Sequence, residues 1–105
     1  METILVISAL PDPAQAKKLA HTLVAQHLAA CVNILPSATS VYRWQGKVET
    51  ANETIILIKT TMAKYLALEA AIKAQHPYEL PEIIAVPVST GLLTYLEWVE
   101  TETSL

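Results

Sequence analysis

Among the one cysteine and three histidines of this sequence, two side chains are the candidates for binding soft or borderline metal ions. Cys31 is the single cysteine of the chain, and as a thiolate it is a good ligand for Cu(I) or Zn(II). His76 precedes Pro77, and an imidazole at such a fixed position suits Cu(II) or Zn(II). No pair of ligands has a C-x-x-C or H-x-x-x-H spacing, so one segment alone does not form a complete metal site. Cys31 and His76 are therefore the metal-ligand candidates.

Both candidates also have a purely structural interpretation. Cys31 lies among small and apolar neighbours, and because free cysteine is among the most buried residue types, core packing is favoured over metal ligation. His76 could equally bond the last carbonyl groups of a helix that ends there, and the two interpretations of this histidine stay open. His21 and His27 are six residues apart, a separation that does not place both on one helix face.

Aromatic and charged side chains suggest a second kind of site, a cleft between subunits. Tyrosine and tryptophan are enriched at protein interfaces, whereas nucleic-acid readers add a basic surface that this sequence lacks. Carboxylates can approach basic side chains in such a cleft, and clefts at interfaces are preferred ligand sites. The residues expected to line an interface or pocket are Tyr42, Arg43, Trp44, Glu53, Lys59, Tyr78, Glu82, Tyr95 and Trp98.

Catalytic motifs are missing from the sequence. It has no nucleophile–base pair, P-loop or G-x-G-x-x-G segment, and its serines have no histidine within a recognisable motif. We therefore expect a protein that is not an enzyme and that needs no obligatory cofactor.

Composition predicts one domain, residues 1–105, that associates with copies of itself. Apolar residues make up 52% of the chain and charged residues 16%, against about 45–50% and about 25% in ordinary globular proteins. A chain this short has a high surface-to-volume ratio, so its surplus apolar surface is expected at a subunit interface.

The net charge and the lengths of the apolar segments argue against nucleic-acid binding and a membrane span, and the first residues argue against secretion. The net charge is −3 and no run of lysine or arginine occurs, which disfavours nucleic-acid binding. Apolar runs such as 55–58 are far shorter than the roughly 20 residues of a membrane-spanning helix. The first residues carry no basic region typical of a secretion signal. One cysteine fits a reducing compartment, so we expect a cytoplasmic protein without membrane partners.

The periodicity of apolar residues predicts the elements that must position these side chains. Strands alternate polar and apolar residues or are apolar throughout, and helices repeat their apolar residues every three to four positions. We expect strands over 3–10, 31–44, 47–60 and 82–88, with helices beginning at 13, after 60 or 61, and at 91.

Proline and glycine mark where these elements bend, turn or end. Asp12 is a candidate N-cap with Pro13 at the first helical position. Pro36 predicts a bulge or a bend within one long strand, and Gln45-Gly46 predicts a two-residue turn. The two arms of that hairpin are about 14 residues long, well beyond the usual five or six. Pro87 predicts either an edge strand or a bulge.

The element order βαββαβ predicts an α+β fold of the ferredoxin-like class with an extra C-terminal helix. Two right-handed crossovers that share a central hairpin give a four-stranded antiparallel sheet with both helices on one face. The other face and the long hairpin then need partners, because exposed flat faces and edges promote aggregation. Packing against copies of the same chain in a closed ring would cover both.

Five segments resemble the CutA divalent-cation-tolerance family, in the same order and over nearly the whole chain. The three longer ones are LAACVNIL with the following proline at 28–36, SVYRWQGK at 40–47 and HPYELPEII at 76–84. The shorter ones are KTT at 59–61 and YLEW at 95–98. Any single motif is weak, but five in register identify the sequence as similar to this family.

The resemblance implies a homotrimer formed by sheet-to-sheet packing, as in PII signalling proteins, and a cytoplasmic role in the response to copper and other divalent cations. The copper-linked members have a cysteine where this sequence has Ser8 and a second histidine where it has Gln75. Cys31 and His76 match, so the resemblance implies weak copper binding.

The alternative function is a small-molecule-sensing or purely structural trimer, with a PII-like ligand pocket between protomers. A shared fold does not transfer the nucleotide sensing of PII proteins to this sequence.

Overall fold

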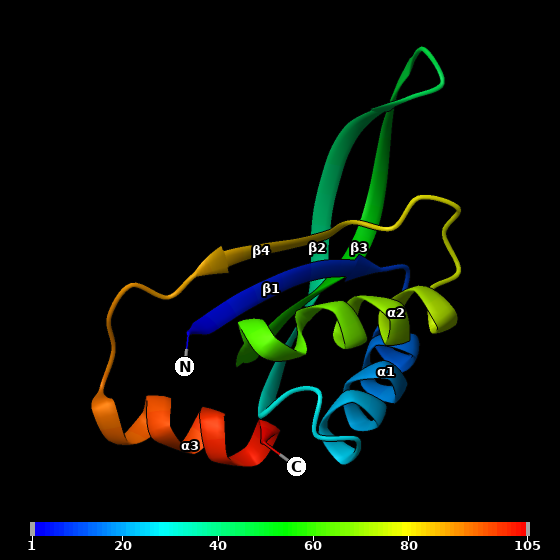
Figure 1. The fold of residues 1–105 in the computed structure, drawn as a ribbon. Coiled ribbons are helices and arrows are strands. Elements are labelled where there is room, and N and C mark those ends of the chain that lie inside the picture. The colour runs from blue at the N-terminus through cyan, green and yellow to red at the C-terminus, as the bar shows by residue number, and fades with distance from the viewer. Residues whose placement is uncertain (1, 105) are drawn as a thin grey trace.

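The computed structural model describes residues 2–104, and its elements follow the predicted βαββαβ order with a C-terminal helix (Figure 1). The elements are β1 (Thr3–Leu10), α1 (Pro13–Ala25), β2 (Cys31–Trp44), β3 (Lys47–Thr61), the 3₁₀ turn η1 (Met62–Lys64), α2 (Tyr65–Gln75), β4 (Ile83–Pro87) and α3 (Leu93–Thr103).

The four strands form one antiparallel sheet in the order β2-β3-β1-β4. Among the described residues β4 pairs with β1 alone, from Ile4↔Pro87 to Ser8↔Ile83. Of the two alternatives that Pro87 predicted, an edge strand or a bulge, the structure has the edge strand. This strand order with two crossover helices is the ferredoxin-like arrangement that the sequence predicted.

The two crossover helices begin in different ways. At α1 the prediction is confirmed: Asp12 accepts the backbone N–H of Gln15 at 2.8 Å, and the Gln15 amide donates to the same carboxylate at 3.1 Å. The expected threonine cap of the second helix is wrong. Thr61 precedes η1 without a side-chain bond and α2 begins only at Tyr65, while the Thr60 hydroxyl donates to the carbonyl of Leu28 at 2.7 Å.

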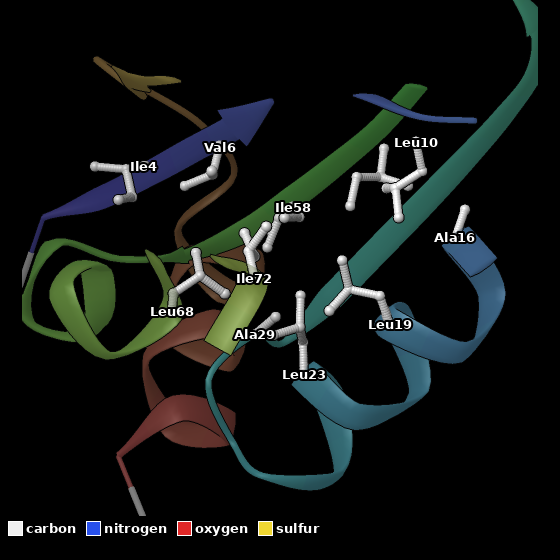
Figure 2. Packing of buried hydrophobic residues seen from close by; sticks show 11 residues of the cluster. Ile4, Val6, Leu10, Ala16, Leu19, Leu23, Ala29, Ile58, Leu68 and Ile72 are labelled. Atoms are coloured by element: carbon white, nitrogen blue, oxygen red, sulfur yellow. The ribbon is translucent and has the colours of Figure 1, made fainter. Parts of the chain in front are cut away.

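One face of the sheet, the covered face, packs against α1 and α2 and forms the hydrophobic core (Figure 2). Each strand sends alternate side chains to this face, and those of Ile4, Val6, Ile56 and Ile58 are fully buried. Burying one such side chain contributes about 1.5–3 kcal/mol. The helices complete the core with Ala16, Leu19, Leu23, Leu68 and Ile72.

The opposite face, which we call the bare face, is also apolar but is only partly sheltered. Its exposed side chains are those of Leu35, Ile84 and Val86, at 45%, 52% and 44%. α3 lies near the end of the sheet where β1 begins (Figure 1), and Nδ1 of His27 donates to the Glu102 carbonyl at 2.9 Å to hold it there. The apolar residues of the bare face are Leu5, Ile7, Leu35, Ile55, Leu57, Ile84 and Val86.

The β2–β3 hairpin, which we call the ribbon, projects well beyond the rest of the protein (Figure 1). Pairing continues to Trp44↔Lys47, and the turn residues Gln45 and Gly46 have φ of 51° and 83°, as a two-residue hairpin turn requires. The predicted bulge is confirmed, since the β2–β3 register shifts between Leu35 and Ala38. No helix within residues 2–104 is long and apolar enough to cross a membrane.

Candidate functional site

His76 is buried at the end of α2, and both of its ring nitrogens are hydrogen-bonded. The backbone N–H of Tyr78 donates to Nδ1 at 3.2 Å, so Nε2 carries the proton and donates to the carbonyl of Ala9 at 2.6 Å. The ring therefore joins the loop after α2 to β1 and does not bond the carbonyls of its own helix. A metal ion can bind His76 only if one of these two bonds breaks.

Cys31 is half-buried at the start of β2 and is not part of the hydrophobic core. Its partner on β3 is Lys59, whose Nζ is 3.8 Å from Sγ and also donates to the Asn33 side chain. Burial raises the pKa of Tyr95 on α3, and the neighbouring Cys31 raises it further. Core packing, the interpretation favoured by the sequence, is therefore wrong, and the thiol lies between a cation and a phenol.

The two metal-ligand candidates lie at different places on the sheet. Cys31 pairs with Lys59 of β3. Ala9, whose carbonyl accepts the hydrogen bond from His76, pairs with Ile55 of the same strand. Four residues along a strand correspond to about 13 Å. Within residues 2–104, no three His, Cys, Asp or Glu side chains are placed to hold a metal ion.

The two other positions at which copper-linked relatives carry ligands do not complete a site. Ser8 is fully buried, and its hydroxyl has no hydrogen-bond partner among residues 2–104. A neutral hydroxyl is a poor ligand for copper compared with a thiolate. Gln75 lies beside Gln15 and Lys18, between α2 and α1. The donor set of one protomer therefore does not fit a high-affinity copper centre.

A groove of about 1010 Å³ lies between the ribbon and the loop that joins α2 to β4. The loop contributes residues from Pro77 to Glu82, and the ribbon contributes residues from Ser40 to Trp44 together with Glu53. Of the residues predicted for an interface or pocket, those that line the groove are Tyr42, Arg43, Trp44, Glu53, Tyr78 and Glu82.

Tyr78 closes one side of this groove over a buried carboxylate. Its hydroxyl donates to Oε2 of Glu53 at 3.0 Å, and its ring lies 4.9 Å from that of His76 with an interplanar angle of 53°. Burial, the bond to Glu53 and the nearby Tyr42 raise the pKa of Tyr78 to about 12. The phenol therefore remains protonated near neutral pH and acts as a hydrogen-bond donor.

The remaining predicted residues do not reach the groove. Lys59 and Tyr95 lie with Cys31 at the other end of the sheet, and Trp98 packs on Tyr95 with ring centroids 5.6 Å apart. Other residues that line the groove were not predicted from the sequence, although Pro77 and Pro81 restrict the shape of the loop after α2. They are Ala9, Ser40, Val41, Pro77, Leu80, Pro81, Ile83 and Ile84.

The fold and the site together define a class of protein: a ferredoxin-like protomer with a long ribbon, an apolar bare face and a groove beside the ribbon. Comparison with known proteins identifies the family. The model of the family described as "CutA1 divalent ion tolerance protein" matches residues 4–102 of the chain. The chain therefore belongs to the CutA1 family, as its motifs predicted.

Individual relatives match over nearly the whole chain. "Divalent-cation tolerance protein CutA" of Thermus thermophilus is 44% identical over 103 residues, 98% of this chain and 99% of the relative. "Protein CutA 1, chloroplastic" of Oryza sativa is 44% identical over 101 residues, 96% of this chain but only 57% of that protein's length. The crystal structure of CutA from Xylella fastidiosa has a TM-score of 0.95 and 48% identity, covering 98% and 99% of the two chains.

Proposed function

We propose that this protein acts in divalent-cation tolerance as a homotrimer and does not catalyse a reaction. The observation that carries the proposal is the match of residues 4–102 to the CutA1 family, with a bacterial relative of almost equal length that is named for tolerance of divalent cations. Such names describe tolerance of cations and not a chemical conversion.

The trimer in this proposal is supported by the two surfaces that a single protomer leaves uncovered. The bare face exposes Leu35, Ile84 and Val86, and the ribbon exposes Val41 and Val48 at 67% and 66%. Head-to-tail packing of one patch on a different patch generates a ring when the rotation closes. Three protomers packed sheet against sheet, as in PII proteins, would bring both surfaces out of water.

Cation binding in this proposal is weak and centres on Cys31. Its thiol is the soft donor among the candidates, it is half-buried, and it lies beside Lys59 and Tyr95. Soft thiolate ligands favour Cu(I). His76 contributes little because both ring nitrogens already have partners within the protomer.

Calorimetric titration tests the metal-binding part of the proposal. Cu(I) and Cu(II) are titrated into the wild-type protein and the Cys31→Ala and His76→Ala variants, with His21→Ala as a histidine control on α1. We expect Cys31→Ala to remove the heat of Cu(I) binding and the two histidine variants to retain it. Equal heats in the wild type and Cys31→Ala, or no heat above dilution in any protein, would remove Cys31 as the cation ligand.

The cytoplasm is the compartment in this proposal, and the sole, half-buried thiol supports it because reducing compartments preserve free thiols. The name of the rice relative places that protein in the chloroplast. Cell fractionation with an antibody against this protein tests the assignment, and recovery in the periplasmic fraction would contradict it.

A further inference from the structure

His27 follows α1 in a backbone conformation that histidine rarely adopts. Its φ is 59°, in the left-handed region where glycine is the usual residue after a helix. The N–H groups of His27 and Leu28 donate to the carbonyls of Val24 and Leu23 at 3.1 and 3.0 Å, as at a glycine-ended helix. A β-carbon makes this conformation less favourable, and such strain is often found where a side chain has a function. The conformation therefore points to a role for the His27 ring that glycine could not fill.

The ring of His27 reaches the end of α3, 75 residues further along the chain. Its Nδ1 donates to the carbonyl of Glu102 at 2.9 Å. This carbonyl is in the last turn of α3, where a helix leaves its own carbonyls without N–H partners. Val99 and Thr103 of the same half of α3 are buried. One hydrogen bond and these buried side chains therefore hold the C-terminal half of α3 against the rest of the protomer.

The N-terminal half of α3 has fewer attachments in the protomer. The first residues of the helix, Leu92 and Leu93, are 75% and 69% exposed, and Leu92 makes no side-chain cap bond. The preceding residues, 88–92, form neither helix nor strand. Because its start is loosely attached, α3 depends on the contacts of its far end to stay against the sheet.

α3 lies over the thiol of Cys31. The helix contacts β3 and β1, and Cys31 pairs with Lys59 of β3, on the same face as Leu57 of the bare face. Tyr95 lies against Cys31: burial raises the pKa of its phenol, and Cys31 raises it further through its charge and a hydrogen bond. Trp98 packs on the Tyr95 ring. The protomer's own helix therefore covers the thiol, whether or not copies of the chain associate.

We propose that α3 is a lid over Cys31 and that the hydrogen bond from His27 to the Glu102 carbonyl is the clasp that keeps the lid closed. When this bond breaks, α3 moves away from the sheet and metal ions or other thiol-reactive species reach Cys31. The inference rests on the proposed function in one respect, since Cys31 is the cation ligand there, and it adds what controls access to that ligand.

The test measures how often the thiol of the folded, full-length protein is uncovered. Cys31 is the single cysteine, so its thiolate alone attacks the aromatic disulfide DTNB, forms a mixed disulfide with one half and releases the other half as a coloured thiolate. The rate of colour release follows the opening of the structure around the thiol. No metal is present, so a failure of Cys31 to bind Cu(I) does not affect this measurement.

Two substitutions of His27 separate the clasp from the conformation of the backbone. His27→Gly keeps the left-handed end of α1 but removes the donor, and should raise the labelling rate about fivefold. His27→Asn also suits this conformation, and its side-chain N–H₂ group can donate from nearly the same position as Nδ1. Its rate should stay within about twofold of the wild type. Urea denaturation should show that both variants remain folded.

Two substitutions in α3 test the lid without changing His27. Val99→Ala removes part of a fully buried side chain and should raise the labelling rate about tenfold. Thr101→Ala is the matched control, because it shortens a β-branched side chain two residues further on at an exposed position, and it should change the rate less than twofold. Low, non-denaturing urea should hardly change the wild-type rate, because a local opening exposes little surface.

Three results would overturn the proposal. Equal labelling rates in the wild type and His27→Gly, or equally fast labelling of His27→Gly and His27→Asn, would show that the hydrogen bond is not the clasp. A wild-type rate that rises steeply with urea would show that the thiol reacts only after global unfolding. A rate that falls as protein concentration rises, with no difference among the variants, would show that a neighbouring copy covers Cys31 in place of α3.

Discussion

The covered and bare faces of the sheet use the same strands and similar side chains but end in different environments. On the covered face, Ile56 and Ile58 are fully buried beneath α1 and α2. On the bare face, Ile84 and Val86 are about half exposed. Side chains alternate between the two faces along each strand, so the contrast lies in what covers each face and not in the strands themselves.

This difference indicates that some of the apolar side chains stabilise the folded protomer, whereas the others are available for association with another molecule. One chain of 105 residues has two crossover helices, enough to cover one face only. The bare face is covered by the protomer's own chain beside the groove, where the loop after α2 lies next to Glu53. There the Tyr78 hydroxyl donates a hydrogen bond to the Glu53 carboxylate. The chain thus shelters its buried charge itself and leaves apolar strand surface for another molecule.

The largest expected effect comes from a truncation on the covered face. Ile58→Ala leaves a cavity among fully buried neighbours and should lower the free energy of unfolding by about 2–5 kcal/mol, measured by urea denaturation. Ile84→Ala makes the same chemical change on the bare face. Its loss should be smaller and should depend on protein concentration, because it acts through association. Equal, concentration-independent losses at both positions would remove the distinction between the faces.

His76→Gln should have the next largest effect. The change disturbs a buried hydrogen bond to the Ala9 carbonyl and a partly buried one from the Tyr78 N–H, and should lower the free energy of unfolding by about 1–3 kcal/mol. His21→Gln, at an exposed position of α1, is the control and should change little. If the two variants have the same stability in urea, His76 does not join the loop to β1.

The Tyr78–Glu53 contact should give a smaller effect that depends on pH. Because the pKa of Tyr78 is raised from 10.0 to about 12, folding favours the protonated hydroxyl, so this stability is complete below pH 10 and is lost as the pH rises towards 12. The ring is 37% exposed, so solvent screening should limit the loss to about 1 kcal/mol or less.

Urea denaturation of the wild type and Tyr78→Phe from pH 9 to pH 12 measures this loss as the difference between the two proteins. Subtraction is needed because the pKa values of Tyr65 and Tyr95 are also raised and both proteins keep these residues. A constant difference across this pH range would contradict the assigned contact.

The smallest effect on the protomer itself is expected from Val86→Lys. Val86 is on the edge strand and its side chain is 44% exposed, so the free energy of unfolding of an isolated protomer should change by about 0.5 kcal/mol or less. A lysine there should nevertheless prevent association, because burying an unpaired charge is costly. Sedimentation should show a folded particle of lower mass than the wild type, and an unchanged mass would place the interface elsewhere.

Most of the fold could be predicted from the sequence because its signals are local. Pro36 and Gln45-Gly46 marked the bulge and the turn of the ribbon, and Asp12 marked the start of α1. The start of α2 could not be predicted in the same way. The Thr60 hydroxyl, a candidate cap by sequence, bonds the carbonyl of Leu28, 32 residues away.

The candidate site was predicted in its residue types but not in its distances. Glu53 and Lys59 lie on the same strand and the same side of the sheet, yet six residues place them about 20 Å apart. The residues predicted to line one cleft therefore lie in two places, some in the groove and others in a separate cluster around Cys31. For His76, the hydrogen-bond partner is the carbonyl of Ala9, 67 residues away, and such a contact leaves no trace in sequence spacing.

The mass of the folded protein in dilute buffer is the most direct test, because the bare face and the ribbon have no other partner in this account. Multi-angle light scattering of the wild type should give three times the chain mass of 11.5 kDa, unchanged on tenfold dilution. A folded, soluble species of 11.5 kDa would contradict the account, since a lone protomer would then tolerate its apolar face in water.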